Sequence, residues 1–320
     1  MESCRSWFQK VVSYREFGII LSLSLMVTTF TIINPAFLSP DNIRTILRGG
    51  AFIGVMSVGV AWVLLSGTFD LSTGAVAGMS AVIASVLIVR EGFPIIPSLL
   101  VGLLSGFAVG VLNYNLVFKA KIPAFLATIG TMFIAKGMAL YISKGWDIYP
   151  LPDVVGEFGR AHPLGISWHF IIFISLVIIS ELVLYLTVYG LEVKATGSDR
   201  EIARLTEVNI RKVSISTYII AGVLSALSGI LLMSRIITGK ATIGTGWELQ
   251  VITGVAIGGV SLFGYEGSFI GVFLGVLALQ VLQNGLIVIG LSQYLNTVVV
   301  GMVLLVVASI DWQRRSKLEL

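Results

Sequence analysis

Charged residues are scarce in this sequence. Only 12% of the 320 residues are Asp, Glu, Lys or Arg, whereas 56% are hydrophobic and the mean hydropathy is +0.96. A soluble domain carries about 25% charged residues, so this chain has too few polar side chains to cover a wetted surface. The composition argues against a soluble enzyme and indicates an integral membrane protein.

Cysteine and histidine are almost absent. Cys4 is the single cysteine, so no intrachain disulfide can form. His162 and His169 are far from Cys4 in the sequence and do not belong to a metal-binding motif. Metal sites need several such ligands at short spacings, and we therefore expect no metal and no cofactor. The net charge of +4 is explained by basic residues gathered at one membrane face, and we expect no nucleic-acid partner.

Apolar runs of about 18 or more residues recur along the whole chain. They predict an all-α polytopic membrane protein, a single domain over residues 1–320, with about ten transmembrane helices. The predicted spans are 17–33, 47–66, 73–89, 95–118, 123–142, 168–189, 213–235, 249–262, 268–289 and 294–310. The eighth is short, and could be tilted, broken or partly inserted. The first is interpreted as a retained span, because no small-residue cleavage site follows it.

Basic residues between the spans set the predicted orientation. They gather at the two ends of the chain and in the loop 190–212 more than in the loops on the other side. Because such residues stay in the cytoplasm, both termini are predicted to be cytoplasmic. The loop 143–167 is then external, and its aromatic residues could anchor it at the membrane surface or contact an external partner.

The inner loop 190–212 predicts a short amphipathic helix. Ser198 and Glu201 have the spacing of a capping box, and Asp199 in the first turn suits the positive end of the helix dipole. Ile202 and Leu205 share one face. Such a helix could rest on lipid headgroups or insert into a groove of a cytoplasmic partner.

Four segments resemble those of a known family. Residues 66–74 read SGTFDLSTG, and residues 121–130 read KIPAFLATIG before Lys136-Gly137. Residues 195–205 begin Ala-Thr-Gly and end Ala-Arg-Leu. The fourth segment combines GWEL at 246–249, GGVSL at 258–262 and NGL at 284–286. In this order, they resemble the permease subunit of bacterial ABC importers for simple sugars of the ribose, xylose and galactose type. Departures such as Thr68-Phe69 in place of Gly-Ile leave the sugar open.

The resemblance implies a pore subunit of an ATP-driven monosaccharide importer in the bacterial inner membrane. Expected partners are ABC ATPase subunits, a periplasmic or lipid-anchored sugar-binding protein, a second permease copy, identical or not, and membrane lipid. The sequence has no Gly-x-x-x-x-Gly-Lys-Ser/Thr loop, so ATP hydrolysis is expected in the partners. The implied coupling residues are Ala195, Gly197, Ser198, Asp199, Glu201, Ile202, Arg204 and Leu205.

Polar residues near the span breaks are candidates for the pathway. Asp70, flanked by glycines, could cap the helix that starts near Ser72 or line the pathway. The full candidate set is Gly67, Asp70, Ser72, Gly74, Asn113, Glu248 and Asn284. Amides on spans could bond sugar hydroxyls or neighbouring helices. Glycines four residues apart, as in Gly106/Gly110, predict close helix packing.

Two mid-span charges, Glu181 and Lys136, are predicted not to pair, because they lie at depths about 10 Å apart. Two other functions stay open. A related ABC permease could carry a signalling sugar or a branched-chain amino acid. An ion-coupled secondary transporter would need mid-membrane carboxylates, for which Glu181 is the candidate. A membrane enzyme is disfavoured, because the spans carry no paired nucleophile and base.

Overall fold

The computed structural model describes residues 14–262 and 264–316. Eight of its helices are long and apolar enough to cross a membrane. They are α2 (Tyr14–Ile33), α3 (Pro40–Leu65), α5 (Ile95–Tyr114), α6 (Ala124–Ser143), α8 (Trp168–Leu186), α11 (Ile210–Ile236), α13 (Phe269–Val288) and α14 (Gln293–Ser316). Two shorter apolar helices, α4 (Thr73–Val89) and α12 (Trp247–Ile257), match the remaining predicted spans. The predicted all-α polytopic fold is confirmed.

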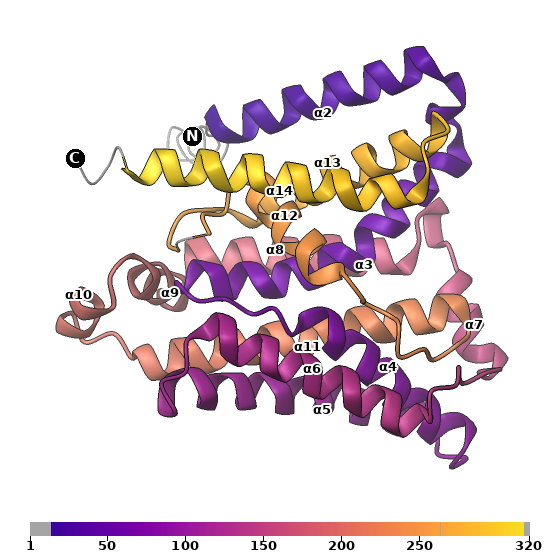
Figure 1. Cartoon of the computed structure of the whole chain (residues 1–320), viewed down its shortest axis with the longest axis horizontal. Coiled ribbons are helices and arrows are strands. Elements are labelled where there is room, and N and C mark those ends of the chain that lie inside the picture. The colour runs from indigo at the N-terminus through magenta and orange to yellow at the C-terminus, as the bar shows by residue number, and fades with distance from the viewer. Residues whose placement is uncertain (1–13, 263, 317–320) are drawn as a thin grey trace.

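The two ends of the described chain lie at one end of the bundle. Figure 1 shows the start of α2 and the end of α14 on the same side as α9 (Val188–Ser198) and α10 (Arg200–Leu205). The short helix α7 (Asp153–Arg160), from the predicted external loop, lies at the opposite end. This arrangement agrees with the predicted loop placement, while the cytoplasmic side itself stays a prediction. Cys4, Arg5, Lys10 and Lys317 lie outside the described residues.

The core of the bundle is built on α3 and α11. In the apolar window of α3, 83% of residues are buried, and in that of α11 61%, against 17% for α2 and 6% for α14. Glycines let the central helices approach. A Cβ on Gly106 of α5 would lie 2.3 Å from the carbonyl oxygen of Gly222 on α11. The close-packing interpretation of the Gly106/Gly110 pair is therefore confirmed, and the outer helices keep apolar faces for lipid or another subunit.

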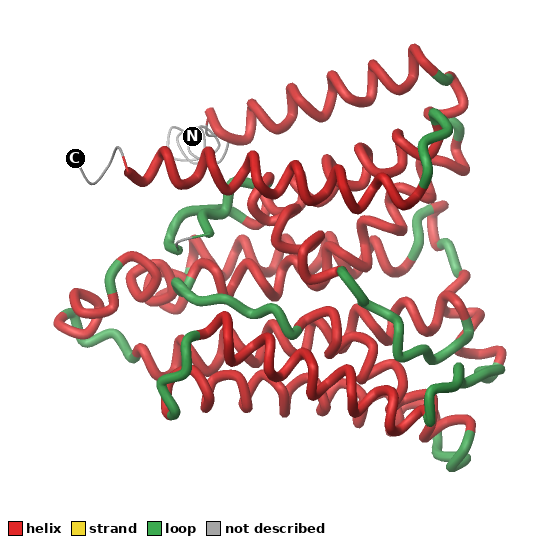
Figure 2. Tube along the Cα trace, in the orientation of Figure 1, coloured by secondary structure: helices red, strands yellow, loops and turns green. Residues whose placement is uncertain are grey.

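Two non-helical segments enter the bundle from opposite ends. Residues 66–72 follow the 26-residue α3 and lead to α4, and residues 237–246 follow the 27-residue α11 and lead to α12. Figure 2 draws both as loops running between the helices. The second segment packs against the start of α4, since a Cβ on Gly74 would lie 2.3 Å from the Gly244 oxygen, and one on Gly244 2.2 Å from the Gly74 oxygen. Only residues without a Cβ allow this contact.

This arrangement explains why the eighth predicted span is short. At about 1.5 Å per residue, the 11 residues of α12 extend over roughly half of a hydrocarbon core of about 30 Å. The non-helical segment before α12 makes up the remaining depth. We call residues 66–72 and 237–246 the first and second re-entrant segments.

Candidate functional site

The first re-entrant segment is held by a buried polar cluster of Asp70, Ser72, Asn113 and Thr131. Asp70 Oδ1 accepts hydrogen bonds from the Ser72 backbone nitrogen at 2.8 Å and from Ser72 Oγ at 2.6 Å. Asn113 Nδ2, from α5, donates to both Asp70 oxygens at 3.3 Å and to Ser72 Oγ at 2.9 Å. Thr131 Oγ1, from α6, donates to Asn113 Oδ1 at 2.6 Å. The cluster ties the segment to two helices.

These side chains are hydrogen-bonded to one another and buried from solvent. Asp70 is 2% exposed and Asn113 is 0% exposed. A carboxylate buried to this degree is costly unless several donors satisfy it, and here Ser72 and Asn113 supply them. The cluster therefore positions the re-entrant segment. Asp70 also serves the start of α4, as the capping interpretation predicted: Ser72 already has helical backbone angles and no side-chain cap bond of its own, and its backbone N–H is bonded to the Asp70 carboxylate.

Backbone carbonyls of this segment are also satisfied by side chains. Tyr218 Oη, on α11, donates to the Phe69 oxygen at 2.9 Å. Arg200 Nη2, at the start of α10, donates to the Gly67 oxygen at 3.2 Å. Irregular backbone at membrane depth needs such partners. Burial lowers the pKa of the Arg200 guanidinium, which also stacks over the Phe118 ring at 4.9 Å.

Three glycines join this segment to the predicted coupling loop. A Cβ on Gly197, near the end of α9, would lie 1.9 Å from the Leu65 carbonyl oxygen. Gly67 and Gly264 both have positive φ, and a Cβ on Gly264 would lie 2.6 Å from the Gly197 oxygen and 3.1 Å from the Gly67 Cα. We call Gly67, Gly197 and Gly264 the glycine junction. It places α9 directly against the start of the re-entrant segment.

The predicted coupling helix is two helices with a break at Asp199. Asp199 has extended backbone and caps α10, its Oδ1 accepting from the Glu201 nitrogen at 2.8 Å and the Ile202 nitrogen at 3.1 Å. Ser198 is the last residue of α9, so the predicted Ser198–Glu201 capping box is wrong. Asp and Ser cap equally well, and the sequence alone could not choose between these neighbours.

The apolar face predicted on this loop is present and exposed. Ile202 is 60% exposed and Leu205 83%, whereas Ala203 between them is buried. Ser198, Asp199, Glu201 and Arg204 are also exposed, while Ala195 and Gly197 are half-buried where α9 packs on the bundle. The loop therefore has an inner part fixed to the bundle and an outer part with free apolar side chains.

Glu181 is bound to a helix terminus. Its Oε2 accepts from the backbone nitrogen of Phe269 at 2.6 Å and of Ile270 at 3.4 Å. The two donors belong to the first turn of α13, where backbone nitrogens lack partners within the helix and a negative charge is favourable. Lys136, by contrast, is exposed on α6. Sequence reasoning missed this bond, because no local pattern links residues 181 and 269.

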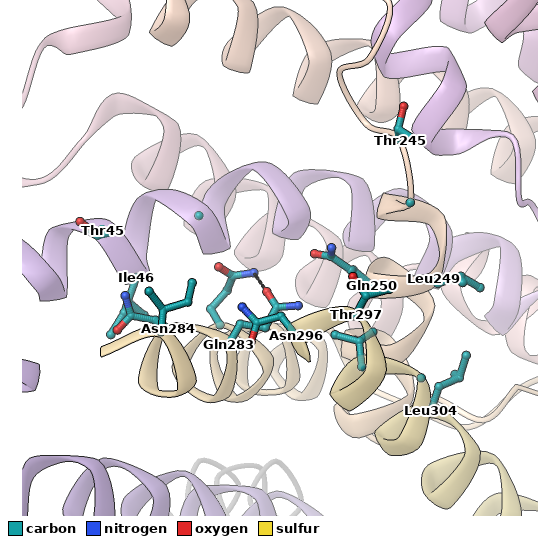
Figure 3. A pocket seen from close by; sticks show the side chains of 16 residues that line it. Thr45, Ile46, Thr245, Leu249, Gln250, Gln283, Asn284, Asn296, Thr297 and Leu304 are labelled. Carbon is teal, nitrogen blue, oxygen red and sulfur yellow. Dashed lines mark hydrogen bonds between the residues drawn. The ribbon is translucent and has the colours of Figure 1, made fainter. Parts of the chain in front are cut away.

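A cavity of about 430 Å³ lies between α3, α12, α13 and α14. Five amide side chains line it, namely Gln250, Gln280, Gln283, Asn284 and Asn296, and none of its lining residues is charged. Figure 3 shows Gln283, Asn284, Asn296 and Gln250 around it. Of these amides, only Asn284 was predicted by residue as a pathway candidate. Gln250 and Asn296 reach the cavity from α12 and α14, and no local pattern links them to Asn284.

The predicted pathway residues therefore occupy four places. Asp70, Ser72 and Asn113 share one cluster, and Gly67 belongs to the glycine junction. Gly74 lies beside Glu248, since a Cβ on Gly74 would be 2.5 Å from Glu248 Oε2. Asn284 lines the separate cavity, where it exchanges two hydrogen bonds with Asn42, both at 2.9 Å.

Comparison with known proteins identifies relatives over nearly the whole length. The ribose import permease protein RbsC of Bacillus subtilis (strain 168) is 34% identical over 93% of this chain and 92% of the relative. The fructose import permease protein FrcC of Rhizobium meliloti is 32% identical over 93% of this chain and 85% of the relative. The L-arabinose ABC transporter permease protein AraH of Azospirillum brasilense is 29% identical over 94% of this chain and 88% of the relative.

No solved structure matches the chain significantly. A protein family does match, over residues 42–308, and its description is branched-chain amino acid transport system / permease component. This range includes both re-entrant segments, the glycine junction and the amide-lined cavity. With its eight helices of membrane-spanning length, the chain is a multi-pass membrane protein that belongs to this family of ABC-transporter permeases.

Proposed function

We propose that this chain is the pore subunit of an ATP-driven importer that passes a monosaccharide across the bacterial inner membrane. The observation that carries the proposal is that relatives named for ribose, fructose and L-arabinose transport match it along nearly their full length. ATP hydrolysis belongs to ABC ATPase subunits in this proposal. A periplasmic or lipid-anchored binding protein delivers the sugar, and a second permease copy completes the pore.

The glycine junction supports a route for coupling. In the proposal, Ile202 and Leu205 of α10 insert into the ATPase, because amphipathic helices dock by such exposed apolar residues. Movement of the ATPase then displaces α9. Since Gly197 contacts the Leu65 backbone and Gly264 contacts Gly67, the displacement reaches the first re-entrant segment without a side chain that could absorb it.

The buried cluster would carry that displacement further. Asp70 and Asn113 link the re-entrant segment to α5, and Thr131 links Asn113 to α6. A shift at Gly67 therefore acts on two spans together. The pathway in this proposal passes near Gly74 and Glu248, where the two short helices start, and opens alternately to the two membrane faces. On the external side, the end with α7 would receive the binding protein.

A branched-chain amino acid is the second candidate substrate. It is favoured by the description of the matching family, whereas the named relatives favour a sugar. An ion-coupled mechanism has less support, because the Glu181 carboxylate is bonded to the start of α13. A carboxylate in this setting is explained by its role at the helix terminus.

The test is purification of the tagged permease in mild detergent, followed by an ATPase assay with candidate binding proteins, each loaded with one solute. Co-purification of an ATPase whose turnover rises with one sugar-loaded binding protein supports the proposal and identifies the sugar. Stimulation only by an amino-acid-loaded protein would replace the sugar with an amino acid. A permease without an ATPase partner that moves solute along an ion gradient would overturn the ABC mechanism.

A further inference from the structure

We infer that the amide-lined cavity is a weak binding site for a neutral, polyhydroxylated solute during its passage, and that it excludes charged solutes. The inference rests on the proposed function and adds a site and a selectivity to it. Its volume of about 430 Å³ falls in the range of about 300–1,000 Å³ found for small-molecule sites.

The position of the cavity suits passage through the membrane. It extends from Thr45 and Asn284, near the end of the bundle where α3 begins, to Thr245 and Leu249, where the second re-entrant segment passes into α12. It thus connects one end of the molecule with the interior point at which the short helices start. A solute that enters there can move toward Gly246 without first crossing the packed core of α3 and α11.

Its chemistry fits hydroxyl groups. Each amide offers both donors and acceptors, as a sugar hydroxyl does, and the amides enter the cavity from three helices. Gln280 Nε2 bonds Gln283 Oε1 at a long 3.3 Å. This weak pair can exchange its hydrogen bond to a solute hydroxyl, because little is lost when it does so.

The same lining disfavours charge and tight binding. No Lys, Arg, Asp, Glu or His lines the cavity, so a phosphate, carboxylate or ammonium group would lose its hydration without a compensating partner. No aromatic ring lines it either. The Asn284 amide already exchanges two hydrogen bonds with Asn42, so it has less hydrogen-bonding capacity left for a solute. These contacts support weak, short-lived binding of a sugar and do not retain it.

One glycine allows the cavity to be filled without disturbing its walls. Gly301 lines the cavity from α14, and a Cβ there would meet nothing within 4 Å. Gly301→Leu therefore puts a side chain into the open space. Gly18→Leu is the matched control, because a Cβ on Gly18 of α2 also meets nothing within 4 Å, and Gly18 is not part of this cavity.

The experiment measures binding and transport separately. Saturation-transfer NMR with millimolar D-ribose or D-ribose 5-phosphate is recorded on the full-length permease in nanodiscs. Sugar uptake is measured with the complete transporter. We expect a D-ribose signal for the wild type and Gly18→Leu that is lost in Gly301→Leu, and no signal for D-ribose 5-phosphate. Uptake should fall at least tenfold in Gly301→Leu alone.

A second variant guards against misfolding. Gln283→Leu keeps the side-chain volume and removes its hydrogen bonds, so uptake should fall by about three- to tenfold while ATPase co-purification is unchanged. Wild-type-like binding and uptake in both cavity variants would overturn the inference and leave the proposed function standing. Equal binding of D-ribose 5-phosphate would overturn the selectivity. A wild-type transporter that imports no sugar would instead refute the proposed function.

Discussion

Replacing Gly197 with alanine tests whether α9 transmits movement to the pore. In an ordinary helix position this change stabilises by about 0.5–1 kcal/mol. Here the new Cβ would lie 1.9 Å from the Leu65 carbonyl oxygen and 2.9 Å from the Tyr265 backbone nitrogen, where ordinary contacts begin at 3.4 Å. Both neighbours are backbone atoms, so no rotamer change relieves the overlap, and α9 must move away by about 1.5 Å.

The expected cost is about 1–3 kcal/mol, typical of overpacking in a well-packed interior. It exceeds the helix gain, and it falls on the contact between α9 and the re-entrant segment. Because α9 lies outside the long apolar helices, membrane insertion should be normal. We expect sugar transported per ATP hydrolysed to fall about tenfold, and stimulation of the ATPase by the loaded binding protein to be lost.

The assay is reconstitution of the complete transporter in liposomes, with sugar uptake and phosphate release measured on the same sample. Gly137→Ala is the matched control, since this helical glycine on α6 has nothing within 4 Å of a Cβ, and its transport ratio should not change. A wild-type ratio of sugar to ATP in Gly197→Ala would refute transmission through the glycine junction.

Three further predictions concern side-chain bonds. Asp199→Ala should lower α10 stability by about 1 kcal/mol and weaken ATPase co-purification, whereas Ser198→Ala should do neither; equal effects would restore the capping box. Asn113→Leu removes a hydrogen-bond donor to Asp70 and should lower the free energy of unfolding by about 1–3 kcal/mol, measured as a lower melting temperature in detergent. An unchanged melting temperature would show that the cluster does not stabilise the fold. Glu181→Gln keeps an acceptor for the start of α13, so uptake should stay within about threefold of wild type, while loss of uptake would favour ion coupling.

The local pattern was sufficient to predict most of the fold. Apolar runs separated by short polar segments located all ten apolar helices, because in a membrane the length and hydrophobicity of a helix are set by the bilayer. Basic residues and loop lengths placed α9 and α10 on the side of the described chain ends. Exposure of Ile202 and Leu205 followed from their spacing, since residues three apart share a helix face.

The candidate site was predictable only in part. Asp70 and Asn113 were both singled out, and the structure joins them, but the bond spans 43 residues and no local signal encodes it. The capping residue of α10 was assigned one position early, because Ser198 and Asp199 compete for the same role. The non-helical path of residues 237–246 could not be predicted from the sequence either, since its course depends on the close approach of the Gly74 and Gly244 backbones.

The sequence by itself determined that the chain is helical, crosses a membrane repeatedly and carries an amphipathic segment in the loop 190–212, because each of these properties is set by residues within one helix or loop. Only the tertiary structure decided that Glu181 serves the start of α13, that three separate glycines form one junction, and that amides from three helices surround one cavity. These are contacts between segments far apart in the chain. Their geometry depends on how closely the backbones approach, and that approach is fixed by the packing of the whole bundle.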